Sequence, residues 1–138
     1  MFALLSAASA GLVSIFGKVG MKEIDSNLAT SIRSVVMTIF LLALCTATGL
    51  WSKLGTLHSK ALTMIALSGV AGAVSWLFYF KAIQVGTVSQ VAPIDKMSMP
   101  LSVVLAVLLL GDRPSRVNWI GILLIAAGAY LAAKPAQA

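Results

Sequence analysis

The sequence predicts an all-α integral membrane protein, a bundle of five transmembrane helices in one domain, residues 1–138. Three observations predict this class. Of the 138 residues, 59% are apolar and only 10% are charged, and the mean hydropathy is +1.00. Apolar runs also recur near the length of about 20 residues that a helix needs to cross about 30 Å of hydrocarbon, where it must satisfy its own backbone groups. The expected spans are residues 2–19, 29–51, 61–81, 87–110 and 117–133.

The first two spans carry few charged side chains. Ala8-Ser9-Ala10 resembles a signal-peptide cleavage site, but no Lys or Arg precedes it and the apolar region before it is short, so we expect residues 2–19 to stay as a span. In the second span, Arg33 lies about one turn inside the start, and we expect it to snorkel or to pair inward. Cys45, the one cysteine, indicates a small core residue and excludes an intramolecular disulfide.

The third span combines small residues with aromatic ones on one face. Gly69 and Gly72 have the spacing that lets a second helix approach closely, so we expect them to be packing residues. Trp76 and Phe80 continue this face at i+4 steps toward Lys81, which suggests an aromatic wall for a ligand. Trp76 and Tyr79 are therefore candidate substrate-binding residues, with a core or interfacial role as the alternative.

The fourth span, residues 87–110, carries Asp95 and Lys96 near mid-depth. An ionised side chain there costs about 2.5 to 3.5 kcal/mol, so both should face protein or water. Adjacent helical residues point about 100° apart, and we expect that the two cannot neutralise each other and that each has its own partner. The Asp95 face continues through Ser98 and Ser102, and we expect Asp95, Lys96, Ser98 and Ser102 to contribute to a substrate cavity. A structural charge network of Asp95 with Arg33 or Lys18 is the alternative.

Two prolines interrupt the hydrogen bonding of this span. Pro93 and Pro100 lack an amide hydrogen, so we expect the carbonyls of Ser89 and Lys96 to lose their helical donors and the helix to bend at both prolines. Carbonyls freed at membrane depth need other partners or water.

The fifth span follows a turn at residues 111–114 and carries Gly121 and Gly128 on one face, which predicts another packing surface. We expect Trp51 and Trp119 to lie at one membrane interface and Tyr79 and Tyr130 at the other, as aromatic belts do.

The basic residues of the loops show no bias for one side of the membrane. An odd number of spans places the two termini on opposite sides, and each side then carries four loop cations. Such a chain can insert in both orientations, and two opposed copies would form an inverted repeat from one chain. The cations are Lys53, Lys60, Arg113 and Arg116 on the amino-terminal side, and Lys18, Lys22, Lys81 and Lys134 on the other.

Other function classes lack the residues that they need. The net charge of +6 lies between apolar runs, not on a basic face interleaved with aromatic residues, so we expect no nucleic-acid partner. His58 has no Cys, Asp or Glu clustered with it, and we expect no metal. Because a nucleophile triad, a phosphate loop and a paired-carboxylate site are all missing, we expect no enzyme and no cofactor.

A set of short motifs follows in order along nearly the whole chain. The motifs are Phe16-Gly17-Lys18, residues 29–34, 76–83, 91–94, 109–113 and 119–121, and Ala127-Gly128. This order resembles the EamA family of the drug/metabolite transporter superfamily. Members usually carry two five-helix units of inverted topology, and this chain resembles the half-length form with a single unit of that ten-helix fold.

The resemblance implies a central substrate cavity, alternating access, and substrates such as amino acids, nucleosides and other small amphipathic metabolites. Many members have Glu in the turn after the fourth span. This chain has Asp112 there, and we expect it to keep the acid's capping role at the fifth helix.

We therefore predict a secondary transporter of small metabolites or drug-like amphipathic compounds, which acts as an antiparallel homodimer in the inner or plasma membrane and for which proton coupling is one option. One alternative is an accessory membrane subunit, such as part of a lipid-linked sugar flippase. Another is a small multidrug cation exporter, which would want an acidic residue in its first span; residues 2–19 contain none.

Overall fold

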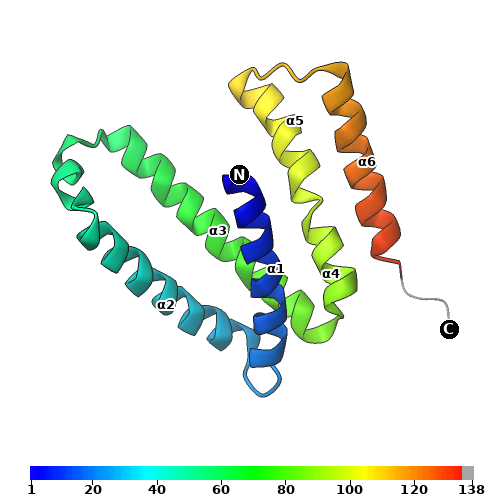
Figure 1. Cartoon of the computed structure of the whole chain (residues 1–138), viewed down its shortest axis with the longest axis horizontal. Helices are drawn as coiled ribbons and strands as arrows, with labels where there is room; N and C mark the ends of the chain where they lie inside the picture. The colour runs from blue at the N-terminus through cyan, green and yellow to red at the C-terminus, as the bar shows by residue number, and fades with distance from the viewer. Residues whose placement is uncertain (135–138) are drawn as a thin grey trace. The chain divides into compact units, whose positions relative to one another are not determined.

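The computed structural model describes residues 1–134, and these are helical with no strand (Figure 1). They divide into two compact units, Phe16–Gln84 and the combination of Met1–Ile15 with the residues from Val85 onward. The helices are α1 (Phe2–Gly20), α2 (Ser26–Ala47), the 3-10 helix η1 (Leu50–Thr56), α3 (Ser59–Val85), α4 (Val88–Asp95), α5 (Ser98–Leu110) and α6 (Arg116–Ala132).

Four stretches of the described chain are long and apolar enough to cross a membrane. They are α1, α2, α3 and the 23 residues Val88–Leu110 that contain α4 and α5. The remaining helix, α6, has 17 residues, which corresponds to about 25 Å at 1.5 Å per residue and is shorter than the hydrocarbon core. The structure thus shows an all-helical protein with four candidate spans, and the fifth span stays a prediction.

The bounds of α2 differ from the predicted span at both ends. The helix begins early because the Asp25 carboxylate caps it, accepting from the amides of Asn27 at 2.8 Å and Leu28 at 3.4 Å. It ends at Ala47 rather than at residue 51. Gly49 there has a φ of 67°, a left-handed conformation that glycine adopts without strain, and the chain continues as η1.

The end of α1 is fastened to the end of α3 within the Phe16–Gln84 unit. The Lys18 ammonium donates to the carbonyl oxygens of Ile83 at 2.6 Å and Gln84 at 3.4 Å, as a cation does at a helix carboxyl end. A Cβ added to Gly17 would collide with the Phe80 ring, so α1 comes this close to α3 only with glycine at this position. Helices α2 and α3 run in opposite directions on either side of η1 (Figure 1).

In the other unit, α6 packs against both α4 and α5. The predicted turn before α6 is confirmed: α5 ends at Leu110, and Gly111 has a left-handed φ of 75°. The expected capping role of Asp112 is wrong. Ser115 caps α6, because its hydroxyl lies at the N-cap position and accepts from the Asn118 amide at 3.2 Å.

Few apolar side chains are buried in the described chain, whereas large apolar residues are exposed along every α-helix. An apolar surface this extensive is suited to lipid or to another protein chain rather than to water. The buried apolar residues are Met21, Tyr79, Phe80, Ile83 and Ala129.

Candidate substrate-binding site

The fourth span is interrupted at the two ionisable residues. Helix α4 ends at Asp95 and α5 begins at Ser98, so Lys96 and Met97 lie between two helices. At this break the amides of Met97 and Met99 donate to the carbonyls three residues back, those of Ile94 at 2.9 Å and Lys96 at 3.0 Å. These bonds replace the helical i to i−4 pattern, and they change the direction in which the neighbouring side chains point.

Asp95 and Lys96 form an ion pair, with the ammonium nitrogen 3.3 Å from a carboxylate oxygen. The expectation that they cannot neutralise each other is therefore wrong, because it assumed an unbroken helix across both residues. The Asp95 side chain is 33% exposed and that of Lys96 53% exposed. The pair is accessible to a ligand or to water rather than enclosed in packed side chains.

The two prolines have different effects from those expected of a single bent helix. Pro93 lies inside α4, three residues before the break, and removes a helical hydrogen bond there. Pro100 lies in the first turn of α5, where an amide has no helical acceptor and its loss costs little. The expected stranding of the Lys96 carbonyl is wrong, since the Met99 amide donates to it.

The serines of the predicted polar stripe are exposed at the start of α5. The Ser102 hydroxyl donates to the Ser98 carbonyl at 2.7 Å, the bond by which a helical serine satisfies itself on its own backbone. Ser98 and Ser102 thus lie in the unit that contains Asp95 and Lys96, and their assignment to substrate binding stays a prediction.

Trp76 and Tyr79 belong to an aromatic cluster on α3, in the Phe16–Gln84 unit. Trp76 stacks on Phe80 with ring centroids 5.5 Å apart and meets Tyr79 edge to face at 5.6 Å. Tyr79 is 9% exposed and Phe80 2% exposed. The expected position of Tyr79 in an interfacial belt is therefore wrong, because its ring is packed inside the unit.

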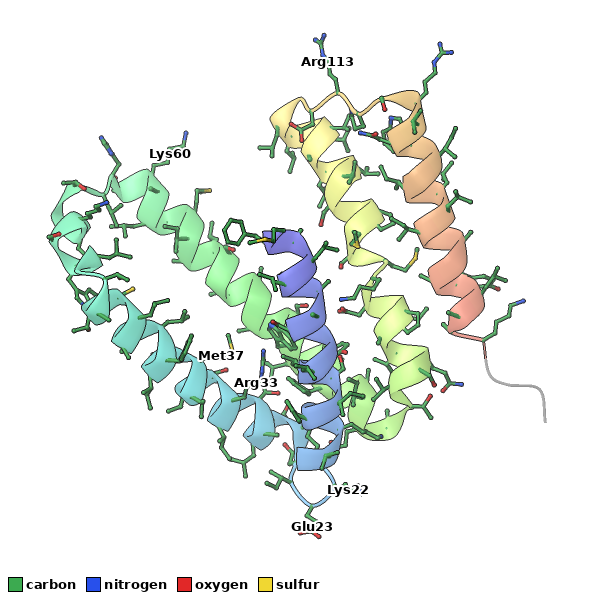
Figure 2. The ribbon with its side chains drawn as sticks, viewed as in Figure 1. Lys22, Glu23, Arg33, Met37, Lys60 and Arg113 are labelled. Carbon is green, nitrogen blue, oxygen red and sulfur yellow. The ribbon has the colours of Figure 1, made fainter. Side chains whose placement is uncertain are left out.

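Arg33 joins this cluster from α2, and it is not among the site residues that the sequence predicts. Its guanidinium carbon lies 3.7 Å from the centroid of the Trp76 ring. Figure 2 labels Arg33 on α2. Of the two expectations for Arg33, snorkelling or inward pairing, this contact favours inward pairing, with an aromatic face as the partner. The available signal was a cation inside an apolar run, but only the fold brings α2 and α3 together there.

The predicted packing glycines have no neighbour within the described chain. A Cβ added at any of Gly69, Gly72, Gly121 or Gly128 would meet no atom within 4 Å. Their packing role thus stays a prediction that concerns contacts with another chain. Among residues 1–134, no group of three His, Cys, Asp or Glu side chains lies close enough together to hold a metal ion.

Comparison with known proteins identifies a family and a related protein. The chain matches the EamA-like transporter family over residues 1–134. It is 44% identical over 132 residues to a protein of Sinorhizobium sp. described as an uncharacterized transporter in the cobO 3′ region, an alignment that covers 96% of this chain and 94% of that relative. No solved structure matches the chain significantly.

Proposed function

The chain belongs to the EamA-like transporter family, and on this basis we propose that it is a secondary transporter for small metabolites or drug-like amphipathic compounds, working by alternating access. Family and relative both point to a multi-pass membrane transporter rather than to an enzyme. The inner or plasma membrane is the location that we propose for it.

The observation that carries the proposal is the ion pair at the break between α4 and α5. Interrupted helices are typical of transporter substrate sites, because backbone groups released from the helix and charges at membrane depth face a cavity there. The stretch Val88–Leu110 has the length of a membrane span, and the break lies close to its middle. A charge pair in that position needs a role that offsets the cost of placing it in a span.

We assign substrate binding to both members of the pair. Asp95 is proposed to receive a cationic group of the substrate or a proton, releasing Lys96, and Ser98 and Ser102 would extend this polar surface along α5. Because the pair is partly exposed and adjacent in sequence, a competing ligand can separate it without unfolding either helix.

We further propose that two copies associate in antiparallel orientation. The balanced loop charges permit insertion in both directions. Helices of a second copy would fit against the helix faces that carry four glycines without neighbours, Gly69, Gly72, Gly121 and Gly128. The helices of one chain also leave many large apolar side chains exposed, which a second copy would cover.

Counterflow in proteoliposomes tests the transporter proposal. Vesicles loaded with an unlabelled candidate metabolite are diluted into the labelled compound, and a library of amino acids, nucleosides and amphipathic drugs is screened in this way. A carrier with alternating access produces a transient, saturable accumulation of label that empty vesicles lack. If no compound exchanges with the purified chain, and exchange appears only when a second membrane protein is added, the chain is an accessory subunit instead.

A further inference from the structure

The guanidinium of Arg33 is held in place by an aromatic platform. Its guanidinium carbon lies over the Trp76 ring, 3.7 Å from the ring centroid, and 5.3 Å from the centroid of the Phe80 ring. Phe80 is buried and stacks on Trp76, so packing fixes the platform itself. The two rings hold the cation through their faces, and the five N–H donors of a guanidinium still need oxygen acceptors.

Those donors have no acceptor in the described chain. Within residues 1–134, Arg33 makes no hydrogen bond or ion pair. The acidic residues number four in the whole sequence. Asp25 is engaged in capping α2, and Asp95 is paired with Lys96. The remaining two, Glu23 and Asp112, make no ion pair with Arg33 either.

The position of Arg33 in α2 makes it unfavourable for this cation to lack an anionic partner. It is the eighth residue of α2 counted from Ser26, which places it about 10 Å into the helix at 1.5 Å per residue. Helix α2 has the length and hydropathy of a membrane span, and a cation–π contact offsets only part of the cost of desolvating a cation inside such a span. A carboxylate would offset more, since it accepts two parallel hydrogen bonds from the edge of a guanidinium.

We propose that Arg33 binds the carboxylate of the transported compound, so that the substrates are amphipathic carboxylates. The half-buried Trp76 ring both orients the guanidinium and offers an apolar surface to the rest of the ligand. This inference rests on the proposed transport function and gives it a substrate class. A phosphate of an anionic lipid is the competing ligand for the same donors.

Binding is measured through Trp76 fluorescence in a variant that carries Trp51→Phe and Trp119→Phe, reconstituted in phosphatidylcholine nanodiscs. The probes are 3-phenylpropionate, its uncharged amide, and 3-phenylpropylamine. We expect a saturable change with the carboxylate only. Arg33→Gln should weaken it about 10- to 100-fold, the range for a lost charge-assisted pair of hydrogen bonds. Arg33→Lys keeps the positive charge but not the planar pair of donors that matches a carboxylate, and it should weaken binding about tenfold.

Arg113→Gln is the matched control. Arg113 projects from the turn between α5 and α6 away from the helices (Figure 2), and its loss should change binding less than about twofold. Melting temperature and helical circular dichroism show whether each variant is folded. If Arg33→Gln is unstable, the folded Arg33→Lys variant decides.

The proposal is overturned if the amide binds as well as the carboxylate, or if folded Arg33→Gln and Arg33→Lys variants bind 3-phenylpropionate like the parent. It is also overturned if adding phosphatidylglycerol changes the fluorescence and 3-phenylpropionate does not, because Arg33 then holds a lipid phosphate. Counterflow separates this failure from failure of the transport function. If the parent and Arg33→Gln both exchange cations and no carboxylates, the transport function stands and the carboxylate site at Arg33 is refuted. If the parent binds carboxylates tightly but exchanges no compound, the carboxylate site stands and the transport function is refuted.

Discussion

Replacing Gly17 tests the close approach of α1 to α3. A Cβ at this position would overlap the edge of the Phe80 ring and lie 3.2 Å from two further ring carbons. The ring cannot readily move aside, because Phe80 is 2% exposed and stacks on Trp76. We therefore expect Gly17→Ala to force either the ring or the helix to shift.

The expected magnitude follows from two opposing terms. Gly to Ala inside a helix stabilises by up to about 1 kcal/mol, whereas an extra carbon in a filled site costs about 1 to 3 kcal/mol. Gly11→Ala is the matched control, since Gly11 also lies inside α1 and a Cβ there would meet nothing within 4 Å. The helix term is common to both variants, so Gly17→Ala should be about 1 to 3 kcal/mol less stable than Gly11→Ala.

The assay is unfolding by sodium dodecyl sulfate in mixed micelles, followed by circular dichroism. The same Gly17→Ala change made in a Phe80→Leu background should cost less, because the shorter side chain leaves room, and the coupling should be about 0.5 kcal/mol or more. If Gly17→Ala is as stable as Gly11→Ala in both backgrounds, the contact between α1 and α3 is refuted.

Three further predictions concern the membrane, the orientation and the end of α3. The protein should stay in the membrane fraction after an alkaline carbonate wash, because apolar side chains are exposed along every α-helix, and its release would remove it from the integral class. Reporters fused after Lys134, one active only in the cytoplasm and one only outside, should both register because the loop charges are balanced, and a single active reporter would leave a parallel or mixed dimer. Lys18→Met should lower the stability by about 1 to 3 kcal/mol, since it leaves the carbonyls of Ile83 and Gln84 without this donor; equal melting temperatures for Lys18→Met and the control Lys22→Met would contradict this.

The helices could be predicted from the sequence because they depend on local patterns. Runs of apolar residues fix where a chain can lie in lipid, and most observed helices lie within a few residues of the predicted spans. The turn at Gly111 was predictable for the same reason, since Gly-Asp-Arg-Pro ends a helix by its own chemistry. The two ends of α2 differ from the predicted span because each depends on a single residue, the Asp25 cap at the start and the left-handed Gly49 after the end.

The candidate site was predictable only in part. Asp95 and Lys96 are conspicuous as charges in an apolar run, but their pairing depends on a break whose position follows from how Pro93 and the first turn of α5 are accommodated. The contact joins Arg33 of α2 to Trp76 of α3, two residues far apart in the sequence, and periodicity within one helix does not show which faces of two helices meet. The burial of Tyr79 likewise depends on what packs around α3, which the residue pattern of α3 alone does not show.

The central claim is that the charge pair at the break between α4 and α5 acts in transport rather than in holding the fold. The direct measurement is transport by Asp95→Asn and Lys96→Met in proteoliposomes beside their melting temperatures in detergent, with Asp112→Asn in the exposed turn as the control. Because both side chains are partly exposed, we predict stability changes within about 1 kcal/mol together with loss of transport, while the control transports normally. Normal transport by well-folded Asp95→Asn and Lys96→Met would contradict the claim, and so would a loss of stability of about 3 to 5 kcal/mol, which marks a buried structural pair.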